Sequence, residues 1–453
     1  MVNLSQINLN YQVVMDNISD RSKNYYPKYI SWLSCTSSAL FFFFIIFQMS
    51  VFNTISADLM HAYSINLTQL GNLSSSYFYA AALALLPAGA LLDRFKPRKQ
   101  LLLVLGLCVI STFVFANYQS FWTAMLYRSL CGVGNAFAFL GCMLMASTWF
   151  SSKRTALVMG LMVTIGMIGG IVQTPFSLLV SLTSWQHAII FDATIGVVIW
   201  LAMWFFLQDP PGVLKAKQAK TAIFDKQNIN EFKAVLANMQ NWFCSIYTAL
   251  LNLPVMLLAA LWGNLYLTQA HDLTKTEASF TTSMIFMGLI LGSPLLGWLS
   301  DKINSRRTPM IGGALFSITI AVLIVYIPEW SFSMLAIAFF LLGFFTSAQT
   351  LSYPTVSESN PSNLTSTALA VVSIIIYIIG AVMEPLFGWL ISLHAGHVMA
   401  TRMSYSAADY QFALMILPIA FIASLMAAFL IRDTLVKDEE ILNQNNPIPL
   451  RTH

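Results

Sequence analysis

The segment GALLDRFKPRK at residues 89–99 recurs 208 residues later as GWLSDKINSRR at residues 297–307. Each copy follows a long apolar stretch and carries glycine, aspartate and basic residues at equivalent positions. A second pair of segments, GIVQTP at 170–175 and GAVMEP at 380–385, repeats at an offset of 210 residues. Because self-similarity at a fixed period indicates repeated structural units, these correspondences predict a chain of two homologous halves.

The composition excludes an ordinary soluble protein. Of 453 residues, 57% are apolar and 9% are charged, whereas charged residues make up about 25% of soluble proteins. A helix that crosses a bilayer needs roughly 20 apolar residues, so the long uncharged stretches predict an all-α membrane protein. The twelve predicted transmembrane helices are 30–57, 69–92, 100–117, 121–149, 155–182, 187–207, 241–269, 278–300, 308–327, 331–357, 364–393 and 410–431.

The basic residues give this topology an orientation. Of the 23 Lys and Arg residues, twenty fall on the side of both termini, Lys275 and Arg402 fall on the other side, and Arg128 lies inside a span. Basic loops resist translocation, so both termini are predicted to be cytoplasmic. The predicted regions are an N-terminal cytoplasmic segment (1–29), a first bundle (30–207), a cytoplasmic linker (208–240), a second bundle (241–432) and a cytoplasmic tail (433–453).

The repeated loop resembles the signature of the major facilitator superfamily, and the resemblance covers essentially the whole chain. The segment Arg128–Gly134, RSLCGVG, also resembles that family's R-x-x-x-G-x-G motif, with Cys131 where Gln is common. The resemblance implies two pseudo-symmetric six-helix bundles that rock about a central site in alternating access. It also implies a gating role for the repeated loops, whose candidate residues are Gly89, Asp93, Arg94, Arg98, Gly297, Asp301, Lys302 and Arg306.

Within these loops, Asp93 and Asp301 are expected to pair with a helix end or a cationic partner across the cytoplasmic interface of the bundles. The structural alternative is a basic turn that only sets topology.

The substrate expectation comes from a finer resemblance. The segments 47–51, 70–79, 349–353 and 358–361 look like a branch of bacterial uptake carriers for amino acids or carboxylate siderophores, distantly related to the lysosomal dipeptide uniporter. This resemblance implies secondary active or facilitative transport of a small polar solute, first an amino acid or short peptide. The alternatives are an organic-anion or carboxylate-siderophore carrier or exporter, and a transporter-like solute sensor.

Three ionisable residues lie inside spans, where they are costly and normally face protein or water. Arg128 is the candidate anchor for a carboxylate, because guanidinium stays charged and donates two parallel hydrogen bonds. Glu384 and Asp192 are candidate proton-coupling groups. The structural alternatives are a pairing with helix carbonyls for Arg128, an inter-helix tether for Glu384 and a helix N-terminal carboxylate for Asp192.

Uncharged polar and aromatic residues complete the predicted substrate site, although each could instead serve helix packing. The candidates are Gln48, Tyr77, Asn135, Asn252, Gln349, Tyr353 and Tyr377. The sequence has no motif of a membrane-embedded enzyme and no P-loop for ATP. The expected partners are therefore a small-molecule substrate, possible coupling protons and the lipid bilayer of a bacterial inner membrane. No cofactor, metal or nucleic acid is expected, and the chain is expected to be monomeric.

Overall fold

The apolar stretches of the sequence fold into helices in the computed structural model, which describes residues 28–118, 120–150, 152–209, 233–327, 329–361, 364–396 and 404–435. Within these residues, twelve helices are long and apolar enough to cross a membrane. Each begins and ends within three residues of a predicted span, so the predicted twelve-span fold is confirmed. The predicted N-terminal segment, most of the linker, Arg402 and most of the tail lie outside the described residues.

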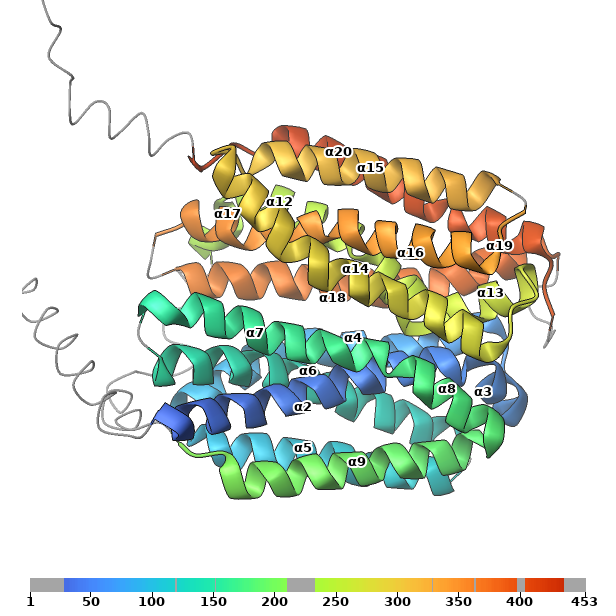
Figure 1. The fold of residues 1–453 in the computed structure, drawn as a ribbon, viewed down its shortest axis with the longest axis horizontal. Coiled ribbons are helices and arrows are strands. Elements are labelled where there is room, and N and C mark those ends of the chain that lie inside the picture. Colours follow the sequence, from blue (N-terminus) through green and yellow to red (C-terminus); the bar gives the residue numbers. More distant parts are fainter. Residues whose placement is uncertain are drawn as a thin grey trace, which may run out of the picture.

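The first half of the chain forms the lower group of helices in Figure 1. Its elements are α2 (Lys28–Thr54), α3 (Ser56–Tyr63), α4 (Leu67–Arg94), α5 (Pro97–Asn117), α6 (Phe121–Trp149), α7 (Ser152–Ile171), α8 (Gln173–Leu182) and α9 (Trp185–Phe206).

The second half forms the upper group. Its elements are α12 (Met239–Leu251), the π-helix η1 (Pro254–Trp262), α13 (Gly263–Ala270), α14 (Lys275–Lys302), α15 (Arg307–Tyr326), α16 (Phe332–Thr346), the 3-10 helix η2 (Ser347–Leu351), α17 (Ser352–Glu358), α18 (Thr365–His394), α19 (Ala407–Leu414) and α20 (Ile416–Leu430).

The predicted repeat is visible in the helix ends. The helices α4 and α14 both have 28 residues, and each begins after a capping box, Asn66 with Gln69 and Thr274 with Glu277. In each box the side chain of the cap residue accepts a hydrogen bond from the backbone amide of the residue three positions later. The side chain of that later residue accepts a hydrogen bond from the backbone amide of the cap residue. The two halves therefore start and end their second span at equivalent positions of the repeat.

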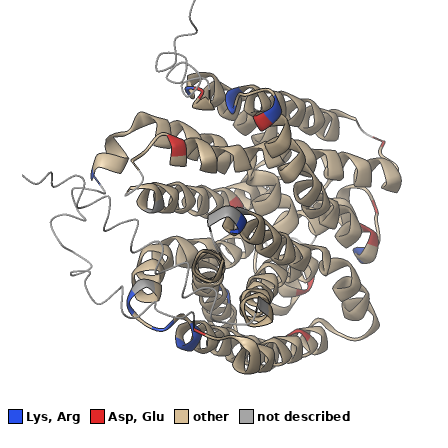
Figure 2. Ribbon diagram, turned by 60° about the vertical axis from the view of Figure 1, so that its left-hand side comes forward, with Lys and Arg blue, Asp and Glu red and all other residues tan. Residues whose placement is uncertain are grey.

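The halves meet in three places that pseudo-symmetry relates: α2 against η1, α4 against α18, and α14 against α7 and α8. Charged residues are sparse along the helices, as Figure 2 makes visible. We call the end with the turns at 95–96 and 303–306 the basic face, at the left in Figure 1, and the end with the turns at 64–66 and 271–274 the opposite face, at the right.

Proline acts differently in the two repeated segments 170–175 and 380–385. The fifth span breaks at Val172, three residues before Pro175. Proline has no amide to donate to the carbonyl four residues earlier, and here the Ser283 hydroxyl from the other half donates to that Ile171 carbonyl at 3.4 Å. By contrast, α18 continues through Pro385. The helix therefore does not break at Pro385.

Candidate substrate site and opposite-face gate

Arg128 lies on α6, seven residues after its first residue, and its side chain is completely buried. Its guanidinium is held between the rings of Phe52 and Tyr77, with Cζ at 4.3 and 4.8 Å from the two ring centroids. Nη1 donates to the Gln48 carbonyl at 3.4 Å, and Nη2 donates to the carbonyl and hydroxyl of Ser74 at 3.3 and 3.1 Å. All of these acceptors are neutral, and within the described residues Nε has no partner.

Two glycines let the surrounding helices approach this guanidinium. A Cβ at Gly132 would lie 2.1 Å from the Tyr77 carbonyl oxygen, and a Cβ at Gly71 would lie 2.6 Å from Cα of Pro385. Real Cβ atoms do not approach backbone that closely, so only glycine fits at either position. Gly132 thereby brings α4 against α6, and Gly71 brings α4 against α18.

Glu384 reaches the same cluster from the second half. Its completely buried carboxylate accepts a hydrogen bond at Oε1 from the Ser74 hydroxyl, 3.1 Å away. Oε2 has no partner among the described side chains, and Trp262 donates its indole N–H to the backbone carbonyl of Glu384 at 3.1 Å. One hydroxyl therefore joins the guanidinium of the first half to the carboxylate of the second half.

Asp192 and Gln48 lie inside the first bundle. Gln48 Nε2 donates to Asp192 Oδ2 at 2.7 Å and to the Thr112 hydroxyl at 3.4 Å, and Gln48 Oε1 accepts from the Tyr127 hydroxyl. Tyr127 is itself stacked on Phe115 at a centroid distance of 4.4 Å. Gln48 thus uses its side chain within its own bundle, and it touches the Arg128 group through its backbone carbonyl.

A second polar contact crosses the halves nearer the basic face. Asn135 Nδ2 donates to the Tyr377 hydroxyl at 2.8 Å, and the Tyr377 ring stacks on Phe78 at 6.4 Å. Asn135 is seven residues beyond Arg128 on α6, and Tyr377 is seven residues before Glu384 on α18, a distance of two helical turns, about 10 Å, on each. The two cross-half contacts therefore lie at successive depths along α18, which meets Ser74 of α4 at Glu384 and Asn135 of α6 at Tyr377.

The remaining predicted substrate residues belong to the second half alone. Gln349, on η2, donates through Nε2 to Oδ1 of Asn252 at the end of α12, 3.1 Å away. Tyr353 follows on α17 and is half-buried. The structure brings Arg128, Tyr77, Glu384, Gln48 and Asp192 into one connected group and places Asn252, Gln349 and Tyr353 outside it.

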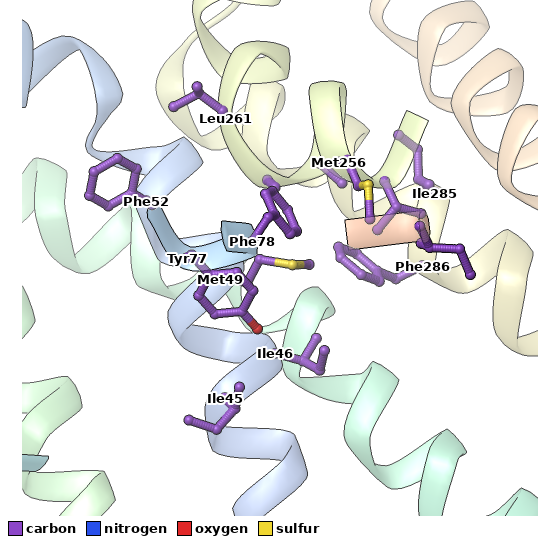
Figure 3. Packing of buried hydrophobic residues seen from close by; sticks show 14 of the residues in the cluster. Ile45, Ile46, Met49, Phe52, Tyr77, Phe78, Met256, Leu261, Ile285 and Phe286 are labelled. Atoms are coloured by element: carbon purple, nitrogen blue, oxygen red, sulfur yellow. The ribbon is translucent and has the colours of Figure 1, made fainter. Parts of the chain in front are cut away.

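The opposite face carries the other polar links between the halves. Asn53 donates through Nδ2 to the carbonyls of Leu258 and Ala259 at 3.0 and 3.2 Å, within the π-helix η1, and its Oδ1 accepts from the Asn264 amide at 3.0 Å. Asp58 forms an ion pair with Lys275 at 2.8 Å. Figure 3 shows apolar side chains from both halves at the same interface, including Met49 and Phe78 with Met256, Leu261 and Phe286.

The predicted gating loops show a different pattern. Arg306 pairs with Asp301 at 2.6 Å and with Glu358 at 2.9 Å, all within the second half. Arg98 donates through Nη2 to the Trp204 carbonyl at 2.6 Å, and its amide donates to Asp209, all within the first half. Among the described residues, the cross-bundle pairing expected of Asp301 is therefore absent in this conformation. The Asp301 carboxylate instead forms an ion pair with Arg306 of its own loop.

Three further residues of the predicted loops, Lys302, Gly297 and Gly89, have described surroundings within their own half or in open space. Lys302 Nζ lies 4.9 Å from the ring centroid of Trp298 on its own helix. A Cβ at Gly297 would meet nothing within 4 Å, and one at Gly89 would meet only Leu140 of its own half, at 3.7 Å. The Asp93 side chain lies outside the described part of the structure.

Sequence reasoning missed four residues of the site. Ser74 was quoted only as part of the 70–79 resemblance, and Tyr127 stands beside Arg128 in the sequence. Asp58 and Lys275 lie at span ends, but Lys275 was one of only two basic residues on the sparsely basic side, a signal that could have drawn attention to it. Across the described residues, no three His, Cys, Asp or Glu side chains lie close enough to hold a metal ion together.

Comparisons with known proteins agree with this architecture. The sequence profile of the Major Facilitator Superfamily matches the chain over residues 38–266 and again over 248–450. A D-galactonate transporter of Escherichia coli is 24% identical over 340 residues, 68% of this chain and 77% of that protein. The membrane sensor protein UhpC of Salmonella typhimurium is 24% identical over 352 residues, 72% of this chain and 76% of that protein.

Among solved structures, a bacterial homolog of the human lysosomal transporter Spinster, in an inward-facing and unoccupied conformation, has the same fold. It aligns with a TM-score of 0.72 at 16% identity and covers 91% of this chain and 99% of that one. The two profile matches together span most of the sequence. The chain therefore belongs to the Major Facilitator Superfamily, as an integral multi-pass membrane protein that transports small solutes and is not an enzyme.

Proposed function

We propose that the chain moves a small organic anion with a carboxylate group, such as a hydroxylated sugar acid, across a bacterial inner membrane by alternating access. The observation that supports this most is the Arg128 guanidinium, which is completely buried and contacts only neutral acceptors and two aromatic rings. An ionised group in such a place is costly unless an opposite charge comes to it.

The hydrogen-bonding groups without partners at Arg128 suit a carboxylate. Arg128 Nε and the Tyr77 hydroxyl are buried without partners among the described residues. A guanidinium presents several donors in a fixed fork that matches the two oxygens of a carboxylate. The D-galactonate transporter to which this chain is similar carries a substrate with that group, which supports the choice of anion class.

Protons are the proposed coupling ion. Arg128 is linked to Glu384 through Ser74, and Gln48 touches both Arg128 and Asp192. With both carboxylates ionised the group has a net charge of −1, so an entering anion would raise the negative charge further. Protonation of one carboxylate offsets the incoming charge. Glu384 Oε2 and Asp192 Oδ1 are both unpartnered among the described residues, and Glu384 is the better placed because one hydroxyl, that of Ser74, joins it to Arg128.

The first sequence prediction, an amino acid or short peptide, remains a candidate with less support. The D-galactonate relative argues for an acid without an amino group. An amino acid would need an acceptor for its ammonium group, and the unpartnered carboxylate oxygens of this cluster are Glu384 Oε2 and Asp192 Oδ1. A panel that contains D-galactonate, simple carboxylates, amino acids and dipeptides separates these possibilities.

The orientation and the region boundaries predicted from the sequence are part of the proposal. Twenty of the basic residues gather on one side, which supports cytoplasmic termini and a cytoplasmic linker between bundles 30–207 and 241–432. Labelling of a single introduced cysteine at Lys302 in intact bacterial cells tests this. Reaction with a membrane-impermeant reagent before lysis would contradict the orientation.

The transport proposal is tested by uptake of the panel into proteoliposomes that contain the purified protein. Arg128→Gln should lower uptake of the preferred anion about 30-fold or more, because removing one partner of a buried charge pair costs about 2 kcal/mol at least. Arg154→Gln, at an exposed arginine of α7, is the matched control and should transport normally. Normal anion uptake by correctly folded Arg128→Gln would refute the anchor.

A second candidate function is solute sensing without flux, which the similarity to the sensor UhpC over 72% of this chain favours. A sensor would bind a panel member, raise its melting temperature and show no uptake in proteoliposomes. Time-dependent accumulation of the solute that stabilises the protein would exclude the sensor.

A further inference from the structure

The serine triplet at residues 74–76 of α4 has one member that behaves differently. Ser75 and Ser76 donate their hydroxyl protons to carbonyls of their own helix, Asn72 at 3.0 Å and Leu73 at 2.7 Å. That is the usual choice of a serine inside an apolar helix. Ser74 instead donates to Oε1 of Glu384, on a helix 310 positions away in the sequence. The triplet thus supplies one cross-half donor and two ordinary neighbours for comparison.

The direction of the Ser74 hydrogen bonds is fixed by Arg128. A hydroxyl has one proton to donate and can accept from another donor. Arg128 Nη2 donates to the Ser74 oxygen at 3.1 Å, which leaves the serine proton to be donated to Glu384 at 3.1 Å. A guanidinium has no acceptor, so the order Arg128 to Ser74 to Glu384 cannot be reversed while Glu384 is ionised.

We propose that Ser74 is the positioning residue that links occupancy of Arg128 to closure of the opposite face. The occupant, a substrate carboxylate, rests on the proposed function, whereas the link between the halves does not. A carboxylate that binds both Nη groups of Arg128 competes for the hydrogen bond that Nη2 donates to Ser74. It also brings a second negative charge near Glu384. The bridge between α4 and α18 then weakens, and the opposite face opens more easily.

The local packing makes this bridge specific to Ser74. A Cβ on Gly71, one helical turn from Ser74, would lie 2.6 Å from Cα of Pro385, the residue after Glu384, so the backbones of α4 and α18 are in close contact at this level. The other polar cross-half contact of α18 is the Asn135 to Tyr377 hydrogen bond, which joins it to α6. Among the described residues, Ser74 to Glu384 is the side-chain hydrogen bond that joins α4 to α18.

The test measures the distance between spin labels on Leu182→Cys and Phe280→Cys, at the opposite-face ends of α8 and α14, in lipid nanodiscs without ligand. Both side chains are exposed, and the five native cysteines are buried. Ser74→Ala should raise the ratio of open to closed distances about fivefold, the effect of one lost hydrogen bond. Ser74→Thr, which keeps the hydroxyl, should restore the wild-type distribution, and Ser75→Ala should leave it unchanged.

A double mutant distinguishes this bridge from a packing effect. In a Glu384→Leu background, Ser74→Ala should cause no further change, because the partner is already gone. An additive effect, or a Ser74→Ala distribution equal to wild type, would overturn the proposal. Adding D-galactonate should shift the wild type toward open distances and should leave Ser74→Ala unshifted. If the ligand-free results hold and D-galactonate shifts neither, the bridge stands and the proposed carboxylate substrate fails.

Discussion

The two ends of the interface between the bundles differ in what holds them. Toward the opposite face, hydrogen bonds and an ion pair cross between the halves at Asn53, Asp58, Ser74 and Thr174. Toward the basic face, Asp301 pairs with Arg306 and Arg98 donates to Trp204 and Asp209, each within its own half. The hydrogen bond from Asn135 to Tyr377 crosses the halves deeper toward the basic face than that from Ser74 to Glu384. The described conformation is therefore sealed at the opposite face.

The contacts around glycine residues also differ between the two ends of the interface. Gly71, Gly170 and Gly388 would each place a Cβ within 3 Å of an atom of the other half, whereas Gly160 and Gly297 would meet nothing within 4 Å. These close contacts with the other half, to backbone at Gly71 and Gly388 and to the Phe286 ring at Gly170, lie between mid-span and the sealed end. The difference indicates that the opposite-face contacts are shaped for closure, while Arg306 and Arg98 of the repeated loops bind partners within their own halves in this conformation.

The largest expected effect on this contrast comes from Gly71→Ala, because its Cβ would fall 2.6 Å from Cα of Pro385. Backbone cannot yield there without separating α4 from α18, so the variant should lose most of the opposite-closed population, more than about tenfold. The spin-label distance between Leu182→Cys and Phe280→Cys measures this. Gly297→Ala is the matched control and should leave this distance unchanged, since its Cβ meets open space. Equal distance distributions in Gly71→Ala and Gly297→Ala would contradict the difference between the two ends of the interface.

A smaller effect is expected when the charge of Lys275 alone is reversed, because two negative charges then face each other at Asp58 and residue 275. Both side chains are partly exposed, at 27% and 39%, so the pair contributes no more than about 1 kcal/mol and should weaken in salt. Lys275→Asp should shift the same distance distribution toward open forms, and the double variant Asp58→Lys with Lys275→Asp should restore it. Reversal of the within-half pair by Arg306→Asp should not move this distance. A shift there as large as that of Lys275→Asp would show that the two ends are not distinct.

The smallest predicted effect is on pH dependence at the sealed end. Burial lowers the pKa of His271, opposed by the nearby charge of Asp272, and Nε2 of His271 contacts the Tyr266 hydroxyl at 2.8 Å. Below pH 6.5 the unfolded chain takes up a proton that the folded site resists, so stability falls as pH falls from its ordinary value toward the lowered one. Between pH 7 and pH 5, the melting temperature of the wild type should fall about 1 to 2 °C more than that of His271→Gln. An equal fall in both proteins would contradict this.

The sequence predicted the spans well because apolar length is read directly from residues. The capping boxes at Asn66 and Thr274 stand 208 residues apart, the offset of the repeated loops. Single ionisable residues in apolar helices also identified Arg128 and Glu384. The breaks inside spans were not predicted, because Pro175 and Pro385 look alike in sequence and only tertiary contacts, such as Ser283 to the Ile171 carbonyl, distinguish them.

The pairing of side chains was the least predictable part. Gln48 was a candidate for substrate contact, but its amide is used by Asp192 and Tyr127 within one bundle. Ser74 was overlooked because a serine in a membrane helix ordinarily bonds to its own backbone. Its role depends on how closely α4 and α18 approach at Gly71, which no local pattern of residues encodes.

The central claim is that one polar site is reached from the two faces in turn. The most direct measurement records two label pairs on the same two spans, in nanodiscs with increasing concentrations of the transported anion. One pair is Leu182→Cys with Phe280→Cys at the opposite face, and the other is Leu157→Cys with Leu299→Cys near the basic face. One distance should lengthen as the other shortens, and in the ligand-free protein the distance at the opposite face should be short. Distances that lengthen together, or a basic-face pair that never changes under transport conditions, would contradict it.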